Sequence, residues 1–462
     1  MGLAIGRQRA ILIRADGLHR YERRVGLIPE HVRQLVDNGI MVFVQPSPIR
    51  IFSAQEYLDA GAQLVSDAKG YASVVCGVKQ IPVDLFEEGV TYMFFSHTHK
   101  GQPGNMHMLR TMMENGCNLI DYEKMVDARG ERVVAFGRFA GIVGMVDTLN
   151  LLGLRLASQG IDPNPFQAVK QTIHYRNGIE EIRTQLRHLG QKIRTDGVPE
   201  AMGPFVVGVL GYGRVSRGAL EMFDEMGPIE LRPEDLLSQA GSLSRHQVYK
   251  VIFQEPDTVE PVDPSKTFSL QDYRTNPQAH LLYASKMGRY LRHITALVSG
   301  IYWEPTQPRL VSRDLLRQLL DEGIASRLRV IGDIGADIDG PIASTITVTN
   351  AEDPYVVYHP STHLTVPGYE GEGFACNVND TAPNGVSLDA SRYFSELLFP
   401  FVPGIVNTNW NAPYDEVIAS LPKEVGPSVI LLKGKLTPPY ESNQAILEGV
   451  RMHGNTPVNH FW

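Results

Sequence analysis

An apolar run that passes directly into a glycine turn and then a helical pattern is the feature that most constrains this chain. Residues 205–210 read FVVGVL, and GYGRVSRGA follows at once. Gly211 permits a tight turn, Gly213 lets the backbone approach a pyrophosphate at a helix amino terminus, and the small Ser216 permits close helix–strand packing. The order of strand, turn and helix predicts a dinucleotide-binding βαβ unit. The alternative is a glycine turn in a doubly wound sheet that binds no ligand.

Strand and helix patterns also alternate through the first 135 residues, where AILIRA, MVFVQP, SVVCGVK and TYMFFSHT are the apolar strand-like runs. Such alternation with helices of about 10–15 residues is typical of parallel sheets. A long apolar segment, AGIVGMVDTLNLLGLRLASQ, predicts a helix that bridges two lobes. We therefore expect an α/β protein with two Rossmann-like lobes, each with a parallel sheet, joined by long helices around an interdomain cleft. We place a discontinuous substrate domain at 1–140 plus 345–462 and the dinucleotide-binding domain at 141–344.

Composition argues against several classes of function. The chain has 462 residues, 20% of them charged, and a net charge of −8, which offers no basic surface for nucleic acid or anionic membranes. Its three widely spaced cysteines suit neither a disulfide framework nor a cysteine-type zinc site, and we expect no metal. No stretch reaches the roughly 18 apolar residues of a membrane span, and the first residues lack the apolar core of a signal peptide. We expect a soluble, cytoplasmic protein that acts on small molecules.

The residues near position 230 bear on the choice of cofactor. The selecting residue is expected about 20 residues after the glycine turn, at the end of the next strand. The sequence PIELRPEDL places Glu230 there, which favours a free ribose, and Arg232, which accommodates a 2′-phosphate. We predict NADPH with Arg232 on its 2′-phosphate, and NADH is the alternative.

Titratable side chains follow two predicted strands of the first lobe. Lys79 ends SVVCGVK and His97 ends TYMFFSH, and ligands bind at the carboxyl ends of strands in open parallel sheets. They are a candidate acid–base pair, whereas two solvated loop residues are the alternative. Lys100 follows closely in the sequence. Asp337 lies just after a late strand, RVIGDI, where helix capping is the alternative to a ligand contact.

Several segments together resemble the lysine–2-oxoglutarate reductase half of bifunctional aminoadipic semialdehyde synthase, namely RADGLHRYERRVGLIPEHV, VVCGVKQIP, FFSHTHKGQPGNM, LIDYEKMVDARGERVVAFGRFAGIVGMVDTL and LVSGIYWEPTQPRL. That family is related to lysine-forming saccharopine dehydrogenase and, more distantly, to alanine dehydrogenase. The resemblance runs from about residue 10 to 425, and DYEKMVD and GIYWE are specific to it. It implies two Rossmann-like lobes, the first completed by chain that returns after the cofactor lobe.

The resemblance also implies roles for individual residues. Lys79 and His97 match the acid–base pair of the family. Arg24 and Arg132 match arginines that hold substrate carboxylates. The expected substrate-binding residues are Arg24, Arg132, Glu123 and Lys100, and the expected cofactor-binding residues are Gly211, Gly213, Arg214, Val215, Ser216, Arg232, Ile301, Tyr302 and Asp337, the last beside the nicotinamide.

The reaction that the resemblance implies is a reductive condensation. The ε-amine of lysine attacks the ketone of 2-oxoglutarate, water leaves to give an imine, and NADPH reduces the imine to saccharopine. Gln80 follows the lysine where fungal enzymes carry Glu, so the identity of the amine stays open. The alternatives are amination of a small keto acid, as in alanine dehydrogenase, and non-catalytic nucleotide sensing. The oligomeric state is also left open, with a homodimer among the possibilities.

Overall fold

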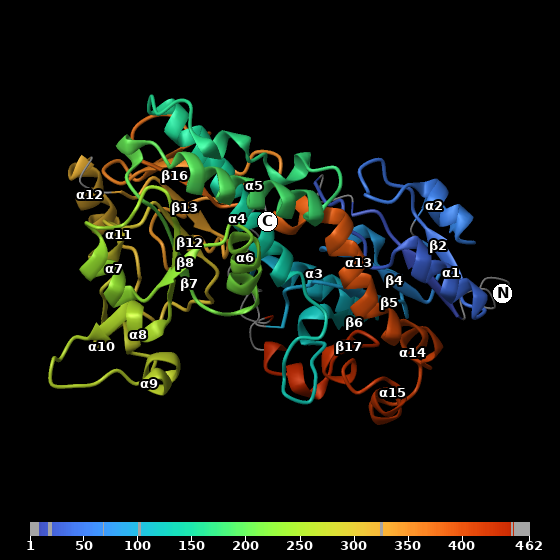
Figure 1. Cartoon of the computed structure of the whole chain (residues 1–462). Coiled ribbons are helices and arrows are strands. Elements are labelled where there is room, and N and C mark those ends of the chain that lie inside the picture. The colour runs from blue at the N-terminus through green and yellow to red at the C-terminus, as the bar shows by residue number, and fades with distance from the viewer. Residues whose placement is uncertain are drawn as a thin grey trace. The chain divides into compact units, whose positions relative to one another are not determined.

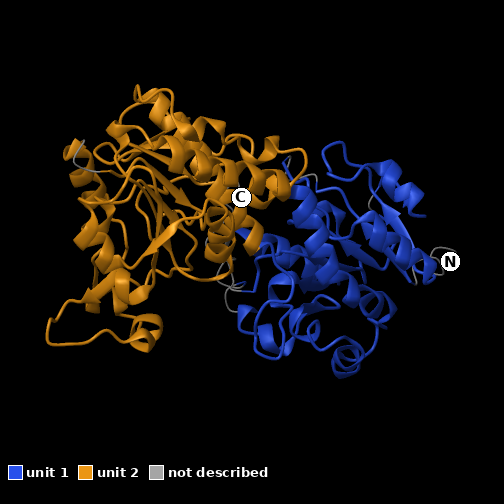
Figure 2. Cartoon of the chain, in the orientation of Figure 1, with its two compact units in different colours: residues 1–136, 387–462 blue, residues 137–386 orange. Residues whose placement is uncertain are grey.

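The computed structural model describes residues 9–16, 21–67, 69–99, 103–323, 327–444 and 447. The chain forms two compact units, unit 1 with residues 1–136 and 387–462, and unit 2 with residues 137–386 (Figure 2). Each unit contains a largely parallel eight-stranded sheet with helices around it (Figure 1). The α/β class with two Rossmann-like sheets, expected from the sequence, is therefore confirmed.

The sheet of unit 1 has the strand order β18-β17-β6-β5-β4-β1-β2-β3. Its parallel strands are β1 (Ala10–Ile13), β2 (Met41–Val44), β3 (Gln63–Leu64), β4 (Val74–Cys76), β5 (Thr91–Phe94) and β6 (Asn118–Asp121), and β17 (Val429–Leu432) and β18 (Lys435–Leu436) are antiparallel. The helices of this unit are α1 (Pro29–Asp37), α2 (Ala54–Asp59), α3 (Pro103–Glu114), α13 (Ser387–Leu398), α14 (Val402–Asn407) and α15 (Tyr414–Ser420). The strands β1, β4, β5 and β6 are buried along their whole length, which explains why β1 and β4 are entirely apolar and why β5 and β6 carry polar residues only at their ends.

The main sheet of unit 2 has the order β15-β14-β16-β13-β12-β7-β9-β8. Its strands are β7 (Phe205–Leu210), β8 (Ile229–Leu231), β9 (Val248–Phe253), β12 (Ala296–Ser299), β13 (Val330–Asp333), β14 (Tyr355–His359), β15 (Leu364–Pro367) and β16 (Phe374–Asn377). Its helices are α4 (Gly137–Ser158), α5 (Ile179–Asp196), α6 (Arg214–Asp224), α7 (Pro233–Gln239), α8 (Glu255–Thr258), α9 (Leu270–Thr275), α10 (Ala279–Leu282), α11 (Gly288–Leu291) and α12 (Arg313–Asp321). Between β9 and β12 the chain adds a short antiparallel pair, β10 (Val259–Pro261) and β11 (Tyr283–Ser285).

The second boundary between the units differs from the expected one. Residues 345–386, which the sequence analysis assigned to the first domain, lie in unit 2. The reason is strand pairing: β16 adds to β13 in parallel, with Val330 opposite Ala375, and β14 pairs with β16 in turn. The first boundary, between residues 136 and 137, lies four residues before the expected position.

The long apolar helix α4 belongs to the core of unit 2. It has 22 residues and is long and apolar enough to cross a membrane, so the expectation that no stretch reaches this length was wrong. Its apolar character is explained by packing, because 83% of its most apolar 18-residue window is buried. A Cβ on Gly141 would lie 1.9 Å from the Val215 carbonyl oxygen, and one on Gly218 would lie 2.0 Å from the Arg138 carbonyl oxygen. Glycines therefore let α4 and α6 approach each other backbone to backbone.

Candidate functional site

The strand, glycine turn and helix form in unit 2 where the sequence places them. Gly211 directly follows β7 with a φ of +85°, and a Cβ there would lie 2.7 Å from Cγ2 of Ile301. Gly213 is the residue before the first turn of α6, and a Cβ on it would meet nothing within 4 Å. The Ser216 hydroxyl is buried and donates to the Leu210 carbonyl at 2.9 Å. The turn thus leaves open space in front of the amino terminus of α6, where a pyrophosphate fits.

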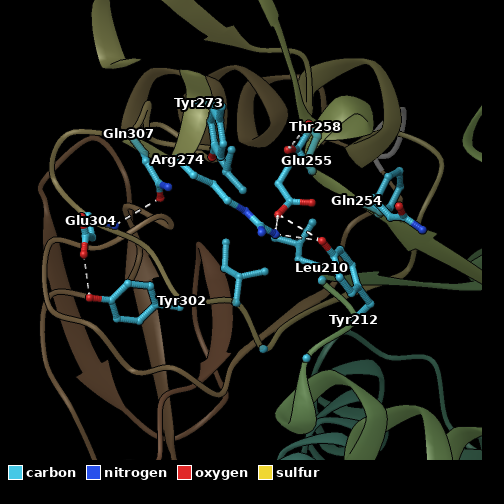
Figure 3. A pocket seen from close by; sticks show the side chains of 16 residues that line it. Leu210, Tyr212, Gln254, Glu255, Thr258, Tyr273, Arg274, Tyr302, Glu304 and Gln307 are labelled. Carbon is cyan, nitrogen blue, oxygen red and sulfur yellow. Dashed lines mark hydrogen bonds and ion pairs between the residues drawn. The ribbon is translucent and has the colours of Figure 1, made fainter. Parts of the chain in front are cut away.

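A cavity of about 390 Å³ opens beside this turn, at the carboxyl ends of β7, β9 and β12 (Figure 3). Four of the expected cofactor residues line it, namely Gly211, Gly213, Ile301 and Tyr302. Arg214, Val215 and Ser216 lie in the first turn of α6. Asp337 is exposed in the loop after β13, where its carboxylate approaches Gly335. The residues of the turn and of the loop after β12 are therefore brought together, as a dinucleotide site requires.

Arg232 lies outside this cavity. It precedes α7, its side chain is 77% exposed, and its guanidinium bonds to Asp235 at 2.7 and 2.9 Å. Glu230 pairs instead with Lys250, at 3.1 Å. The sequence analysis assumed that the next strand in the chain lies beside β7, but β8 is the edge strand and β9 occupies that position. The residues at the carboxyl end of β9 are consequently the ones that line the cavity.

Glu255 and Arg274 are the charged pair in the cavity that the sequence analysis missed. Glu255 follows β9, and Arg274 comes from α9 in the insertion between β9 and β12. The Arg274 guanidinium contacts the Glu255 carboxylate and donates to the Tyr212 hydroxyl at 2.9 Å (Figure 3). The hydrogen bond to Glu255 is the main cause that raises the pKa of Arg274. The sequence does contain a signal for Glu255, because the polar segment QEPDT directly follows the apolar run VYKVIF, where a strand ends.

In unit 1, Lys79 lies with two acidic residues at the carboxyl edge of the sheet. Its backbone N–H donates to the Asp16 carboxylate at 3.1 Å, and Arg14 pairs with the same carboxylate at 3.4 Å. The Lys79 ammonium also interacts with the Glu22 carboxylate. Burial opposes ionisation of Glu22, but Arg24 and Lys79 lower its pKa below the usual value. Asp16 and Glu22 follow β1 and belong to the segment RADGLHRYERRVGLIPEHV that the sequence analysis noted.

Arg24, expected to hold a substrate carboxylate, is buried with a protein carboxylate as its partner. Its guanidinium donates to both oxygens of Glu22, at 2.8 and 2.6 Å. It also lies 4.2 Å from the centre of the Phe136 ring. A substrate carboxylate bound to Arg24 would therefore lie beside Glu22. It would accept hydrogen bonds from the guanidinium N–H groups that Glu22 does not use.

His97 belongs to a second group, centred on the Glu123 carboxylate. That carboxylate lies 3.3 Å from Nδ1 of His97, 3.2 Å from Nδ1 of His99 and 2.7 Å from the Arg132 guanidinium. Burial opposes its ionisation, but the neighbouring His97, Arg132 and His99 lower the pKa of Glu123 to about 2. Arg132 is thus held by a glutamate, with its side chain 45% exposed. Lys100, the remaining expected substrate residue, lies outside the described residues.

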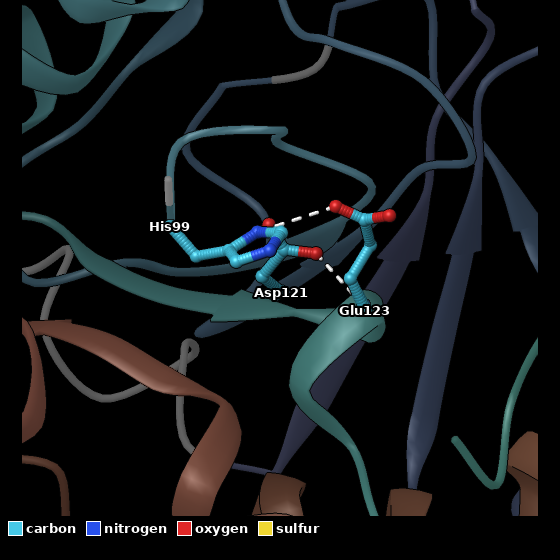
Figure 4. Close-up of side chains that lie close together, drawn as sticks. All are labelled: His99, Asp121 and Glu123. Carbon is cyan, nitrogen blue, oxygen red and sulfur yellow. Dashed lines mark hydrogen bonds and ion pairs between the residues drawn. The ribbon is translucent and has the colours of Figure 1, made fainter. Parts of the chain in front are cut away.

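His99, Asp121 and Glu123 have potential metal-ligand atoms within 4.8 Å of one another (Figure 4). Asp121 is buried, accepts a hydrogen bond from Ser96 at 2.5 Å, and has its pKa raised by burial to about 6. The Arg132 guanidinium on Glu123 places a positive charge beside the three residues, which disfavours a cation there. The arrangement suits proton transfer better than metal binding.

The Lys79 and His97 groups follow neighbouring strands. The backbone N–H of Phe95, two residues before His97, donates at 3.1 Å to the carbonyl of Val78, the residue before Lys79. His97 has a φ of +52°, an uncommon conformation for a residue with a side chain, and its carbonyl accepts from Asn105 at 3.3 Å. Such backbone conformations concentrate at functional sites. Both expected acid–base residues therefore lie at the ligand-binding edge of one sheet.

The depressed pKa of Glu123 predicts a stability effect at low pH. Ionised Glu123 stabilises the fold above its ordinary pKa of 4.5, and this contribution is lost as the pH falls from 4.5 towards 2. A shift of this size corresponds to at most about 3 kcal/mol. We expect the Tm difference between the wild type and Glu123→Gln to shrink when melting is followed from pH 6 down to pH 3.5. The exposed Glu114→Gln is the matched control, and an equal pH dependence in both variants would contradict the assignment.

Comparison with known proteins places this geometry in a family. Residues 13–143 match the family model of the amino-terminal domain of alanine dehydrogenase and PNT. Alpha-aminoadipic semialdehyde synthase of Rattus norvegicus is 32% identical over 452 residues, which are 94% of this chain and 48% of the relative. The NAD(+), L-lysine-forming saccharopine dehydrogenase of Yarrowia lipolytica is 26% identical over 82% of this chain and 88% of its own length. The chain belongs to the alanine dehydrogenase and saccharopine dehydrogenase superfamily.

Solved structures of this superfamily share the fold. An L-alanine dehydrogenase superposes with a TM-score of 0.56 at 18% identity, covering 96% of this chain and 99% of the other. A transhydrogenase from Sinorhizobium meliloti gives 0.55 at 15% identity, covering 93% and 100%. At these identities the likeness shows a shared fold. The chain spans about half the length of the aminoadipic semialdehyde synthases that it matches, 48% of the rat protein and 41% of the Arabidopsis thaliana protein.

Proposed function

We propose that this chain catalyses the reductive condensation of lysine with 2-oxoglutarate to saccharopine, with a nicotinamide cofactor as the reductant. The observation that carries the proposal is the placement of Lys79 and His97, each beside carboxylates, at the carboxyl edge of one sheet. Its support from relatives is the 32% identity to aminoadipic semialdehyde synthase over 94% of the chain. The glycine turn and its cavity in unit 2 fit a dinucleotide.

The residues of unit 1 have complementary parts in the proton transfers. The Lys79 ammonium, which interacts with the Glu22 carboxylate, donates a proton as the carbinolamine hydroxyl leaves as water. The His97 imidazole acts as the general base and accepts the proton that the substrate ammonium must lose. Glu123 orients the His97 ring through Nδ1. When bound, the nicotinamide cofactor supplies the hydride that reduces the imine carbon.

Carboxylate groups of the substrates require cationic partners on the protein. The exposed part of the Arg132 side chain and the remaining donors of Arg24 supply guanidinium forks, which match planar carboxylates. Both arginines are held in place by glutamates, Glu123 and Glu22. Their geometry is therefore fixed before the substrate arrives, which lowers the entropy cost of binding.

The test of the proposed function is cofactor oxidation with 2-oxoglutarate across a panel of amines, namely lysine, ornithine and ammonia. We expect lysine to give the highest kcat/KM and saccharopine as the product identified by mass spectrometry. Turnover of ammonia with pyruvate in preference to lysine would favour the alanine-dehydrogenase-like alternative. Cofactor binding without oxidation in any mixture would favour a nucleotide-sensing role.

We further propose NADPH as the reductant, with Arg274 in place of Arg232 as the ligand of the 2′-phosphate. Arg274 is the guanidinium that lines the cavity, whereas the carboxylate of Glu255 would favour a free ribose. Arg274→Ala is expected to raise the KM for NADPH by about tenfold, the loss of one charge-assisted hydrogen bond, and to leave the KM for NADH nearly unchanged. Arg232→Ala, a change outside the cavity, is the control and should alter neither. A larger effect of Arg274→Ala on NADH would instead support NADH as the cofactor.

A further inference from the structure

Two arginines share a cavity at the amino-terminal edge of the unit 2 sheet, the edge opposite the glycine turn. We call it the rear cavity; it has a volume of about 310 Å³. Arg155 reaches it from the last turn of α4, and Arg329 directly precedes β13. Buried leucines and Phe374, the first residue of β16, form its apolar wall. The rear cavity is therefore built by the sheet core and is distinct from the cofactor cavity.

Arg155 is bound there by uncharged partners. The residue is only 3% exposed, and its guanidinium donates to the carbonyls of Tyr369 and Gly371 at 2.9 and 2.7 Å and to the carbonyl of Gly373 at 2.7 Å. Its Nε is buried without a hydrogen-bond partner. Among the described residues no carboxylate pairs with Arg155, so its charge has no counter-charge in this part of the protein.

Arg329 adds a second positive charge to the rear cavity. Its Nε is also buried without a hydrogen-bond partner, and the ion pairs of the described chain do not include it. After burial, the charge of Arg329 is the next cause that lowers the pKa of Arg155. The acidic residue of the lining, Glu372, has a side chain 75% exposed and lies 3.7 Å from His359. The two guanidinium groups thus face the same space with like charge.

Two partly buried arginines of unit 2 show the contrasting case of a carboxylate partner, Arg183 with Glu225 and Arg292 with Glu322. A buried charge without a partner is costly, and an anion in the rear cavity would remove that cost. We propose that the rear cavity binds a small anion through a carboxylate or phosphate group, held by Arg155 and Arg329. Guanidinium donors match the oxygens of both groups. Such a site goes beyond the proposed reaction, because it lies at the edge of the sheet away from the cofactor.

The test is thermal melting of the full chain with NADPH present, titrated with inorganic phosphate in one series and with glutarate in another. An anion that binds the folded chain raises Tm with concentration. The apparent Kd is expected to rise about tenfold or more in Arg329→Gln, because a charge-assisted hydrogen bond is lost. Arg329→Lys, which keeps the charge, should retain more of the binding. A response to phosphate alone would assign a phosphate ester, and a response to glutarate alone would assign a dicarboxylate.

The matched control is Arg317→Gln on α12, which removes the same charge from a side chain that is 58% exposed. It should bind both anions like the wild type. Because phosphate and glutarate also suit the cofactor and substrate regions, a loss in Arg329→Gln with none in Arg317→Gln locates the binding in the rear cavity. Without anion, Arg329→Gln should have an unchanged or higher Tm, since one of two like charges is gone. No Tm rise in the wild type with either anion, equal losses in both variants, or a lower anion-free Tm of Arg329→Gln would overturn the proposal.

Discussion

Replacing Lys79 by Met is expected to lower kcat by about 10²–10⁴-fold, the usual contribution of a positioned acid–base group, while cofactor affinity stays near the wild-type value. The reason is that the Lys79 ammonium interacts with the Glu22 carboxylate, and its backbone N–H with Asp16, at the carboxyl edge of the unit 1 sheet, whereas the glycine turn belongs to unit 2. Steady-state kinetics and a separate cofactor titration measure the two quantities. The control is Lys124→Met, which replaces another lysine of unit 1. This variant should keep the wild-type kcat.

His97→Gln in the same assay tests whether the two residues act together. Residues that serve one proton-transfer sequence are strongly non-additive. The double variant Lys79→Met, His97→Gln should therefore lose little more activity than the more damaged single variant. Near-wild-type kcat in both single variants would show that the two residues are structural and that the chemistry lies elsewhere.

Alanine at Gly211 and at Gly213 should separate two roles of the glycine turn. Gly211→Ala places a methyl group 2.7 Å from Ile301 on a backbone with a φ of +85°. Strain of about 1–3 kcal/mol is expected, so Tm should fall, and cofactor affinity should fall by about tenfold to a hundredfold as the Ile301 loop shifts. Calorimetric melting and fluorescence titration with NADPH measure the two effects.

Gly213→Ala is the matched variant. Its φ is −71° and a Cβ there meets nothing within 4 Å, so the Tm of the cofactor-free chain should not change. Cofactor affinity should still fall, because the methyl group occupies the space through which a pyrophosphate approaches the helix. If Gly213→Ala binds NADPH as tightly as the wild type, the cofactor does not bind at this turn.

The features that the sequence predicts correctly are those set by neighbouring residues. The strand, turn and helix around Gly211 form because apolar periodicity, glycine and a helix start follow one another directly. The positions of Lys79 and His97 at strand ends follow from the buried runs of β4 and β5. The site residues themselves stay predictions, for which the structure supplies positions and partners.

The features that escape the sequence depend on distant pairing. Whether β8 or β9 lies beside β7 is decided by contacts such as Val206 with Tyr249. Because of this strand order, Glu255 and Arg274 line the cavity beside the glycine turn and Arg232 does not. The assignment of residues 345–386 failed for the same reason, because β16 completes a sheet that begins far earlier in the chain. The pattern of neighbouring residues does not indicate which distant strand a given strand will pair with.

The return of the chain into unit 1 has a consequence for biosynthesis. The outer edge of β6 is covered by β17, which is translated only after all of unit 2. At about 5–20 residues per second, the nascent chain carries that strand edge unpaired for on the order of tens of seconds. Unpaired edges invite association with other chains, so the ribosome-bound form is the stage at which chaperone protection matters most. Unit 2 is continuous in sequence and ends at residue 386, so it is fully translated before β17 is made and can pair with β6.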